Sequence, residues 1–252
     1  MASIQIELPD GSIKDFEAGI TPYDVALSIS EGLARQTLAA RFNGALIDTT
    51  RALEESGKLL LITLSSPEAL EMIRHSCAHL MAQAVKELYG NEVQVTIGPA
   101  IKDGFYYDFY SETKKFVPED FPVIEAKMEE LAKSDMPVER KVMNRDEAIA
   151  MFRSMGEDYK VELIEDLDQD TLTLYQQGGF IDLCRGPHVP RTGVFKAFKL
   201  TSLAGAYWRG DEKKAMLQRI YATAFLNKKD LKKHLERLEE ARKRDHRKLG
   251  RE

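Results

Sequence analysis

Residues 73–81 read IRHSCAHLM, and residues 181–188 read IDLCRGPH. The first stretch places His75 four residues before a second histidine, and the other stretch places Cys184 at the same distance before a histidine. Side chains at positions i and i+4 lie on one face of a helix, so a second strand or loop can bring the thiol and its histidine over the first pair. The two stretches therefore predict a compact cluster of three imidazoles and one thiol.

The residues around the first stretch predict a helix. Ser66, Pro67 and Glu68 form a start signal, with a hydroxyl to cap free N–H groups and a proline at the first turn, and Gly90 supplies a stop. Apolar residues recur on one side at helical spacing: Leu70, Ile73, Cys77, Leu80, Met81, Ala84 and Leu88. The opposite side is polar, with His75, His79, Gln83 and Lys86. We expect this polar side to line a cleft or meet solvent; two solvated surface histidines are the alternative.

The composition is that of an ordinary globular protein. The chain has 252 residues, 43% hydrophobic and 31% charged, which is long enough for two domains, since domains of about 100 to 150 residues are commonest. No apolar run approaches the roughly 20 residues that cross a bilayer, and the N-terminal MASIQIELPD lacks a signal-peptide pattern. We therefore expect a cytoplasmic protein without a membrane partner. Cys77 and Cys184 are the only cysteines, which excludes a disulfide framework.

Basic residues concentrate at the C-terminal end. Residues 227–252 contain 11 Lys and Arg against 6 Asp and Glu, a charge of +5, so the net charge of −5 leaves −10 for residues 1–226. The segment predicts one helix with a sparse apolar seam at Leu231, Leu235, Leu238 and Leu249. We interpret its charges as a solvated face; a linker helix that contacts a polyanion is the alternative. Since no stop signal follows, we expect the helix to continue into a larger protein.

The first 64 residues predict a small module of their own. IQIELPDGSIKDF alternates apolar and polar residues around Asp10 and Gly11, and ARFNGALID gives a second strand pair around Asn43 and Gly44. A helix opens with the capping pattern TPYD, and KLLLITL supplies a last strand. This order resembles the ubiquitin-like β-grasp fold, in the variant found in TGS modules. It carries no catalytic constellation, so we interpret it as a binding or spacer module.

Residues 65–225 carry the chemistry. After the histidine helix, strands predicted at VQVTIGP, GFYYDFY and PVERKVM interleave with helices at FPVIEAKMEELAKS, interpreted as a helical hairpin, and at RDEAIAMFRSMG. YKVELIED then precedes a strand pair that reaches GGFIDLCRGPHVP. The absence of a regular βαβ repeat predicts an α+β fold. No Gly-rich phosphate loop, GxSxG elbow or paired-carboxylate pattern occurs, which removes the commonest enzyme classes.

Segments along the whole chain resemble the N-terminal region of bacterial-type threonyl-tRNA synthetases: HSCAHLMAQAV, IGPAIKDGFYYDF, DYKVELI, DLCRGPHVP, GAYWRGDEKKAMLQRIYATAF and RLEEARKRDHRKLG. The HxxxH and CxxxH pair alone is shared with alanyl and free-standing editing domains, whereas the TGS module and the RDHRKLG tail indicate the threonyl branch. The resemblance implies a TGS β-grasp domain at 1–64, an editing domain at 65–225 and a linker helix at 226–252. It also implies that the class II aminoacylation core, with its ATP and zinc, and the anticodon-binding domain are missing from this chain.

This resemblance implies a proofreading activity. Serine lacks one methyl group of threonine, and a pocket built for the larger side chain gains only about 1 to 3 kcal/mol of discrimination from that methyl. A second site that hydrolyses the wrong ester supplies the remaining accuracy. We therefore expect the chain to cleave Ser-tRNA(Thr), with the serine-charged acceptor end of tRNA(Thr) as its partner and no DNA partner.

The resemblance also implies roles for individual residues. His75 is the expected group that orients or deprotonates the water, and Lys160 is expected to hold a second water or to stabilise charge on the leaving ribose oxygen. From the residues alone, we would interpret Lys160 as a surface lysine at the end of a strand. The expected substrate-binding residues are His79, Gln83, Gly98, Tyr107, Asp182, Cys184 and His188. The expected contacts with the single-stranded tRNA end are Arg185, Tyr207, Trp208 and Arg209.

Three of the substrate-binding residues carry more specific expectations. Asp182, two residues before Cys184, shares its strand face and accepts the serine ammonium. Gly98 lets the backbone approach the ligand. Tyr107 contacts the amino acid or the terminal adenosine, and a place in the apolar core is the alternative.

A metal role for the cluster stays open. The quartet His75, His79, Cys184 and His188 suits zinc by ligand type, and the alanyl branch resembles a zinc binder. The threonyl branch implies editing with no required cofactor, and a filled four-ligand zinc would leave no position for the reacting water. Two other functions also stay open: a metal-stabilised RNA-binding adaptor without catalysis, and a regulatory or structural partner that uses the β-grasp module for protein contacts.

Overall fold

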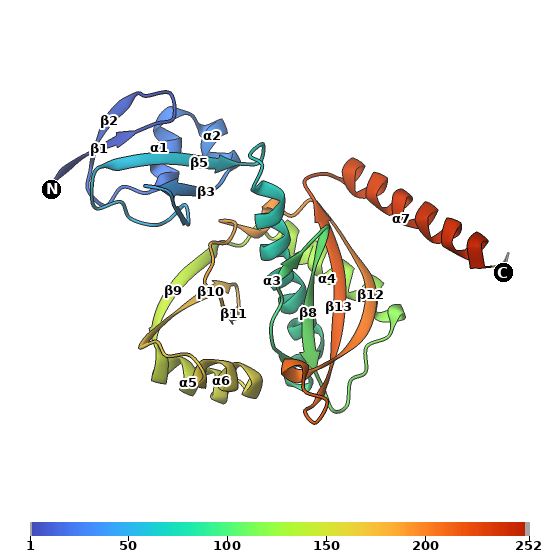
Figure 1. The fold of residues 1–252 in the computed structure, drawn as a ribbon. Coiled ribbons are helices and arrows are strands. Elements are labelled where there is room, and N and C mark those ends of the chain that lie inside the picture. The colour runs from blue at the N-terminus through green and yellow to red at the C-terminus, as the bar shows by residue number, and fades with distance from the viewer. Residues whose placement is uncertain (1, 250–252) are drawn as a thin grey trace.

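The computed structural model describes residues 2–249, with side chains as far as Arg244. It consists of an N-terminal sheet module, a larger body and a C-terminal helix α7 (Lys228–Leu249) that extends from the body (Figure 1). The predicted α+β class is confirmed. The last three residues of the predicted linker helix and the side chain of Leu249 lie outside the described residues. Within the described range, no helix combines the length and the apolar character needed to cross a membrane.

The N-terminal module is a five-stranded sheet with two short helices. Its strand order is β2-β1-β5-β3-β4, with β1 parallel to β5 and the hairpins antiparallel, which is the predicted β-grasp arrangement. Its elements are β1 (Ser3–Glu7), β2 (Ile13–Glu17), α1 (Pro22–Ile29), α2 (Glu31–Gln36), β3 (Thr37–Phe42), β4 (Ala45–Ile47) and β5 (Gly57–Thr63). Helix α2 is an addition to the predicted order.

Two local signals set the geometry of this module. Asn43 and Gly44 have φ angles of 49° and 84°, and positive φ at both positions is what a two-residue type I′ hairpin turn requires. Thr21 caps α1, because its hydroxyl accepts the Asp24 amide at 3.2 Å while the Asp24 carboxylate accepts the Thr21 amide at 3.3 Å. Both features confirm expectations that rest on neighbouring residues alone.

The central helix α3 (Ala69–Tyr89) contains His75 and His79 and is followed by Gly90, as predicted. The predicted hydroxyl cap is wrong. Helix α3 begins after Glu68 without a side-chain cap, and the Ser66 hydroxyl instead accepts the Thr63 amide at 2.9 Å. On the polar side of the helix, His79 and Gln83 are buried, whereas His75 and Lys86 are partly exposed.

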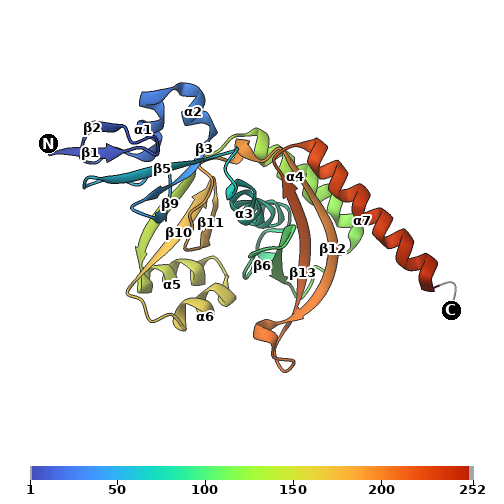
Figure 2. The same cartoon turned by 45° about the horizontal axis from the view of Figure 1, so that its top comes forward.

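Helix α3 lies between two sheets (Figures 1 and 2). The larger sheet has the order β12-β13-β8-β6, with β7 paired to β8, and helix α4 packs beside α3. The strands are β6 (Gln94–Val95), β7 (Ala100–Ile101), β8 (Gly104–Tyr110), β12 (Ala197–Tyr207) and β13 (Met216–Phe225), and the helix is α4 (Phe121–Lys133). The smaller sheet has the order β11-β10-β9 and packs on two helices. Its elements are β9 (Val138–Asn144), α5 (Arg145–Ser154), α6 (Asp158–Glu165), β10 (Thr171–Gln177) and β11 (Phe180–Leu183).

Two segments of the body differ from the expectation. FPVIEAKMEELAKS forms the single helix α4 after one 3-10 turn at Pro118–Asp120, so the predicted helical hairpin is wrong. Lys160, read as a surface lysine at a strand end, lies in helix α6 and is 2% exposed. Val161 and Ile164 of α6 belong to the apolar cluster under the smaller sheet.

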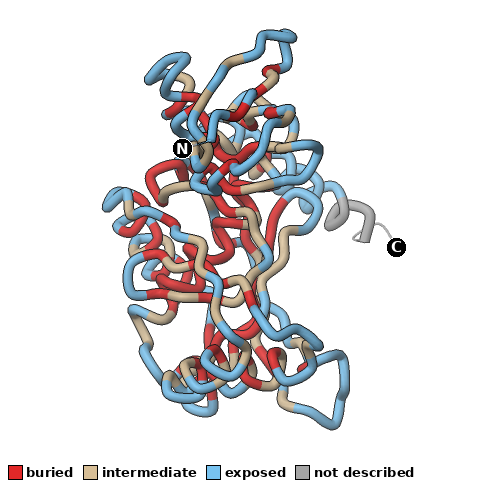
Figure 3. The backbone as a smooth tube through the Cα atoms, turned by 90° about the vertical axis from the view of Figure 1, so that its left-hand side faces the viewer, coloured by how far each residue is buried: buried red, intermediate tan, exposed pale blue. Residues whose placement is uncertain are grey.

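The module and the body share an apolar core. One cluster of buried residues joins Leu38 and Ile62 of the module to Ala69 and Met72 of α3. Buried residues accordingly occur in both parts and where the two meet (Figure 3). The module is therefore packed onto the body and is not held by its linker alone.

Helix α7 contacts the body through only part of its surface. The His234 ring is 8% exposed and its centroid lies 5.0 Å from that of Phe225 at the end of β13. Leu238, a member of the predicted apolar seam, is 48% exposed. The charged side chains of the helix from Lys228 to Arg244 are exposed, as the solvated-face interpretation expects.

Candidate functional site

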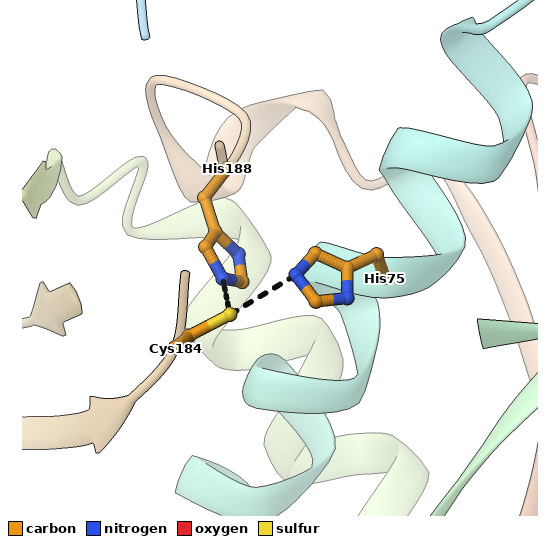
Figure 4. A group of neighbouring side chains, drawn as sticks. All are labelled: His75, Cys184 and His188. Carbon is orange, nitrogen blue, oxygen red and sulfur yellow. Dashed lines mark hydrogen bonds between the residues drawn. The ribbon is translucent and has the colours of Figure 1, made fainter. Parts of the chain in front are cut away.

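The two sequence motifs meet at the polar side of α3. His75 comes from α3, Cys184 directly follows β11, and His188 lies four residues further along the loop (Figure 4). The Nε2 atoms of His75 and His188 each lie 3.2 Å from the Cys184 Sγ atom. The predicted convergence of residues more than 100 positions apart is thereby confirmed.

The fourth member of the predicted quartet is oriented elsewhere. The His79 ring centroid lies 4.2 Å from that of His188 and 6.0 Å from that of His75. Its Nε2 atom lies 3.4 Å from the Asp182 Oδ2 atom, and both side chains are buried. Among the described residues, the donor atoms of His75, Cys184 and His188 lie within 4.8 Å of one another. The predicted set of four donors is therefore wrong for His79, which does not belong to this group. The His79 Nε2 atom thus contacts the buried carboxylate and is not part of the donor group around the thiol.

Asp182 is the centre of a second, charged group. Its Oδ1 atom forms an ion pair with the Lys160 ammonium and accepts the Leu183 amide at 2.8 Å, and its Oδ2 atom accepts the Tyr107 hydroxyl at 2.7 Å. Burial raises the pKa of Asp182, but the charges of Lys160 and His79 and these hydrogen bonds together hold it below its usual value. Asp182 is therefore an anion, and with His79 beside it the roughly four acceptor positions of a carboxylate are in use.

Lys160 has no free donor left in this arrangement. Besides Asp182, its ammonium donates to the Thr96 carbonyl oxygen and, at 3.2 Å, to the Tyr107 hydroxyl oxygen. An ammonium has three donors. Lys160 thus contacts Asp182 directly, while its expected contact with a water or with the leaving ribose oxygen stays a prediction.

Tyr107 and Gly98 are packed against each other. Tyr107 is fully buried on β8, and a Cβ atom added to Gly98 would lie 2.2 Å from its Cδ2 atom. Gly98 is therefore explained by the close approach of an aromatic ring. The Tyr107 ring belongs to the apolar core, which was the alternative, and its hydroxyl contacts Asp182. Its contact with the amino acid or the terminal adenosine stays a prediction.

Gln83 lies one turn beyond His79 on α3. Its carbonyl oxygen accepts the Gln177 side-chain amide at 2.8 Å, and its own amide donates to Glu87 at 2.9 Å. Together with Lys86 and Phe180 it lines a small cleft of about 240 Å³. The expectation that the polar side of α3 lines a cleft is thereby confirmed for this end of the helix.

The cluster is uncharged at neutral pH. Burial lowers the pKa of His75, partly opposed by the negative Asp182 and Glu71, and burial lowers the pKa of His79 to about 4. The pKa of His188 is held well below its usual value, first by burial and then by the neighbouring histidines. Burial also raises the pKa of the Cys184 thiol to about 11. The group therefore offers neutral imidazoles, which accept protons, beside a protonated thiol.

The members of the cluster differ in their exposure to solvent. His75 and Cys184 are partly exposed, whereas His79, His188 and Asp182 are buried. Arg185, directly after Cys184, is exposed. A substrate that reaches the cluster from solvent therefore meets His75 and Cys184 first.

The other predicted tRNA contacts lie where β12 ends: Tyr207 is its last residue, and Trp208 and Arg209 belong to the 3-10 turn that follows. Tyr207 is 43% exposed, but Trp208 is 3% exposed and its indole N–H donates to Glu162 at 3.0 Å. Arg209 forms ion pairs with Glu162 and Asp166. In this arrangement Tyr207 has an exposed ring, while the Trp208 ring is covered and the Arg209 charge is balanced.

The sequence did not single out three residues that hold the cluster. The Ser76 hydroxyl lies 3.0 Å from His188 Nδ1 and accepts the Val189 amide at 3.1 Å. The Tyr175 ring packs against His188 with centroids 4.4 Å apart, and its hydroxyl donates to Asp48 in the N-terminal module at 2.7 Å. Ser76 could have been suspected from its place between His75 and Cys77, but no local pattern connects Asp48 with residues 140 positions away.

The three gathered donors fit a zinc ion in type and proximity. Two imidazole nitrogens and one sulfur atom are common zinc ligands, and three protein ligands leave a fourth position open, as in catalytic zinc sites. The thiol would have to lose its proton on binding, which its raised pKa opposes in the absence of a metal.

Two family models match this chain. The TGS domain matches residues 4–63, and the threonyl and alanyl tRNA synthetase second additional domain matches residues 172–221, which include Cys184 and His188. Over all 252 residues the chain is 64% identical to the threonine–tRNA ligase of Syntrophotalea carbinolica and 58% identical to that of Geobacter sp. strain M21, covering 40% and 39% of those proteins. Over 246 residues, 97% of the chain, it is 56% identical to 38% of the ligase of Legionella pneumophila strain Corby. The chain thus spans about two fifths of the curated relatives it matches, and its predicted similarity to the N-terminal region of bacterial threonyl-tRNA synthetases is confirmed.

Proposed function

We propose that this chain, which is similar throughout to the N-terminal 40% of bacterial threonyl-tRNA synthetases, is a proofreading fragment that hydrolyses Ser-tRNA(Thr) to serine and free tRNA. The observation that carries the proposal is the partly exposed His75, held neutral beside the Cys184 and His188 side chains. The match of residues 172–221 to the second additional domain of threonyl and alanyl synthetases supports it. We expect the activity in the cytoplasm.

The reaction needs a positioned water and a proton acceptor. In the proposed mechanism the neutral His75 imidazole takes a proton from the water as its oxygen attacks the ester carbonyl carbon. The carbon–oxygen bond to the ribose then breaks, and the proton passes to the leaving ribose oxygen. Cys184 and His188 form the adjoining wall, where the protonated thiol can donate a hydrogen bond to the developing oxyanion.

The charged group behind this wall has a positioning role in the proposal. Lys160 keeps Asp182 ionised, and Asp182 in turn fixes the His79 ring. An incoming serine ammonium would replace the His79 contact, which at 3.4 Å is the longest contact of the carboxylate. Lys160 therefore acts through Asp182 in this mechanism, and direct contact with the substrate is a further prediction.

A bound zinc ion would be held by His75, Cys184 and His188 and would supply a Lewis acid and a water of lowered pKa. The proposal itself uses only side chains of the chain. Because the three donors fit a zinc ion, a second candidate function is a zinc-stabilised adaptor that binds tRNA without catalysis.

The test is a deacylation assay with Ser-tRNA(Thr) and the purified chain. We expect wild-type chain to release serine and His75→Ala to lower the rate by about 100- to 10,000-fold, the usual contribution of a general base. His234→Ala is the matched control, because it removes another buried histidine outside the cluster, and it should hydrolyse normally. If the wild-type chain binds the charged tRNA but releases no serine, the adaptor function replaces this proposal.

A further inference from the structure

A carboxylate of the N-terminal module reaches into the proposed editing site. Asp48 follows β4 and is 8% exposed. Its Oδ2 atom accepts the Tyr175 hydroxyl at 2.7 Å, and its Oδ1 atom accepts the backbone amide of His188 at 3.1 Å. The Nε atom of Arg140 lies 4.0 Å from the Asp48 Oδ2 atom, which is a weaker charged contact. Asp48 therefore contacts the backbone of a cluster residue and the aromatic ring that supports it.

The contacts of Asp48 bear on the loop that carries Cys184 and His188. Tyr175 packs against the His188 ring, and a Cβ atom added to Gly186 would lie 1.8 Å from the Tyr175 hydroxyl oxygen. Gly186 also has a φ of 68°, so the loop wraps closely over the end of the tyrosine. The position of the tyrosine hydroxyl thus limits where the loop can lie.

The loop is fixed from both sides. On one side Ser76 of α3 contacts His188 Nδ1 and accepts the Val189 amide. On the other side Asp48 accepts the His188 amide, so that the ring and the backbone of the same residue are held by different parts of the protein. The Cys184 amide donates to the Thr173 carbonyl oxygen of β10 at 3.2 Å, which fixes the start of the loop.

We propose that Asp48 is a positioning residue of the editing site, so that the TGS module completes the site by holding the Cys184–His188 loop. The expected effect on kcat rests on the proposed deacylase function. The expected effect of Asp48 on the position of the loop does not depend on that function. Removal of the carboxylate leaves the Tyr175 hydroxyl and the His188 amide buried without an acceptor. The loop would then shift, and the Sγ and Nε2 atoms of the cluster would shift with it.

Simple attachment of the module is the competing role for Asp48. The apolar cluster of Leu38 and Ile62 with Met72 already joins the module to α3. If Asp48 only strengthened this attachment, its loss would lower stability and leave the geometry of the cluster unchanged in folded protein. A readout at Cys184 separates the two roles.

Alkylation of Cys184 provides that readout. The other cysteine, Cys77, is fully buried, so the rate of iodoacetamide modification of native chain, followed by mass spectrometry, reports on Cys184. We expect faster alkylation of Cys184 in Asp48→Ala, since the thiol loses its fixed contacts. The kcat for Ser-tRNA(Thr) should fall about 10- to 100-fold with a smaller change in KM, because a displacement of about 1 Å at a catalytic group costs up to about 100-fold.

Three further variants make the test decisive. Asp15→Ala, at an exposed acidic residue on β2 of the same module, should match wild type in both readouts. Tyr175→Phe should change both readouts in the direction of Asp48→Ala, and the double variant should be no worse than Asp48→Ala, since one contact is shared. Asp48→Asn keeps one acceptor oxygen and should give intermediate values, which covers the case that Asp48→Ala does not fold.

The proposal is overturned if folded Asp48→Ala or Asp48→Asn matches wild type in alkylation and kcat, or loses only thermal stability. If the wild-type chain has no deacylase activity, the proposed function fails, but the alkylation rates still decide whether Asp48 positions the loop.

Discussion

The ion pair between Lys160 and Asp182 provides a quantitative test of the charged group. Each of the two side chains is 2% exposed, so the pair is shielded from solvent. In Lys160→Met the aliphatic stem is retained and the charge is lost. Removing one partner of a buried pair costs about 3–5 kcal/mol. In a protein of this size each kcal/mol changes the melting temperature by about 2–4 °C, so we expect a fall of about 6–20 °C.

The pH dependence of stability should reverse in this variant. In the wild type Asp182 has a pKa below its usual value, so it stabilises the fold above the unfolded pKa of about 3.9 and loses this contribution as the pH falls. Without Lys160, burial dominates and raises the pKa of Asp182 above the unfolded value. The carboxylate then destabilises the fold at neutral pH, and Lys160→Met should recover stability as the pH falls through that raised pKa.

Urea unfolding at pH 5 and pH 7.5 measures both effects. Lys133→Met is the matched control, because Lys133 has 80% of its side chain exposed and forms a surface ion pair with Glu129 at 3.8 Å. It should change the free energy of unfolding by at most about 0.5 kcal/mol. Lys160→Met/Asp182→Asn should recover part of the loss, since no uncompensated charge remains. A loss below about 1 kcal/mol for Lys160→Met, or double-variant losses that simply add, would refute the reasoning.

Three further predictions concern the cluster and its surroundings. Because burial lowers the pKa of His75 below its usual 6.5, kcat/KM for deacylation should be constant around pH 7 and fall only at lower pH; a fall that begins above pH 7 would contradict a neutral His75 base. Gly98→Ala should destabilise the chain by about 1–3 kcal/mol in urea unfolding, because its Cβ atom meets the Tyr107 ring, whereas Gly179→Ala, with nothing within 4 Å, should not. Deacylation should survive dialysis against a chelator, with metal content measured on the same sample; loss of activity that zinc restores would assign the chemistry to a metal held by His75, Cys184 and His188.

Sequence reasoning was most successful where neighbouring residues decide the structure. The turn at Asn43 and Gly44 and the end of α3 at Gly90 follow from backbone preferences of single residues. The meeting of Cys184 with His75 followed from matched spacings in two motifs. Such signals are carried within a few positions of the chain.

The remaining features depend on residues that meet only in the folded protein. His79 shares a helix face with His75, but the buried Asp182 sets its orientation. Lys160 lies in a helix that packs under the smaller sheet, and its buried partner Asp182 comes from a distant strand. The contact of Asp48 with His188 joins two modules, and no spacing rule predicts such a contact.

The central claim is that the cluster hydrolyses the seryl ester in preference to the threonyl ester. Single-turnover deacylation of Ser-tRNA(Thr) and Thr-tRNA(Thr) by the wild-type chain, measured side by side, tests it most directly. We predict rapid release of serine and release of threonine at least about tenfold slower, since exclusion of one methyl group corresponds to about 1–3 kcal/mol. Equal rates for the two esters, or no release of serine, would contradict the claim.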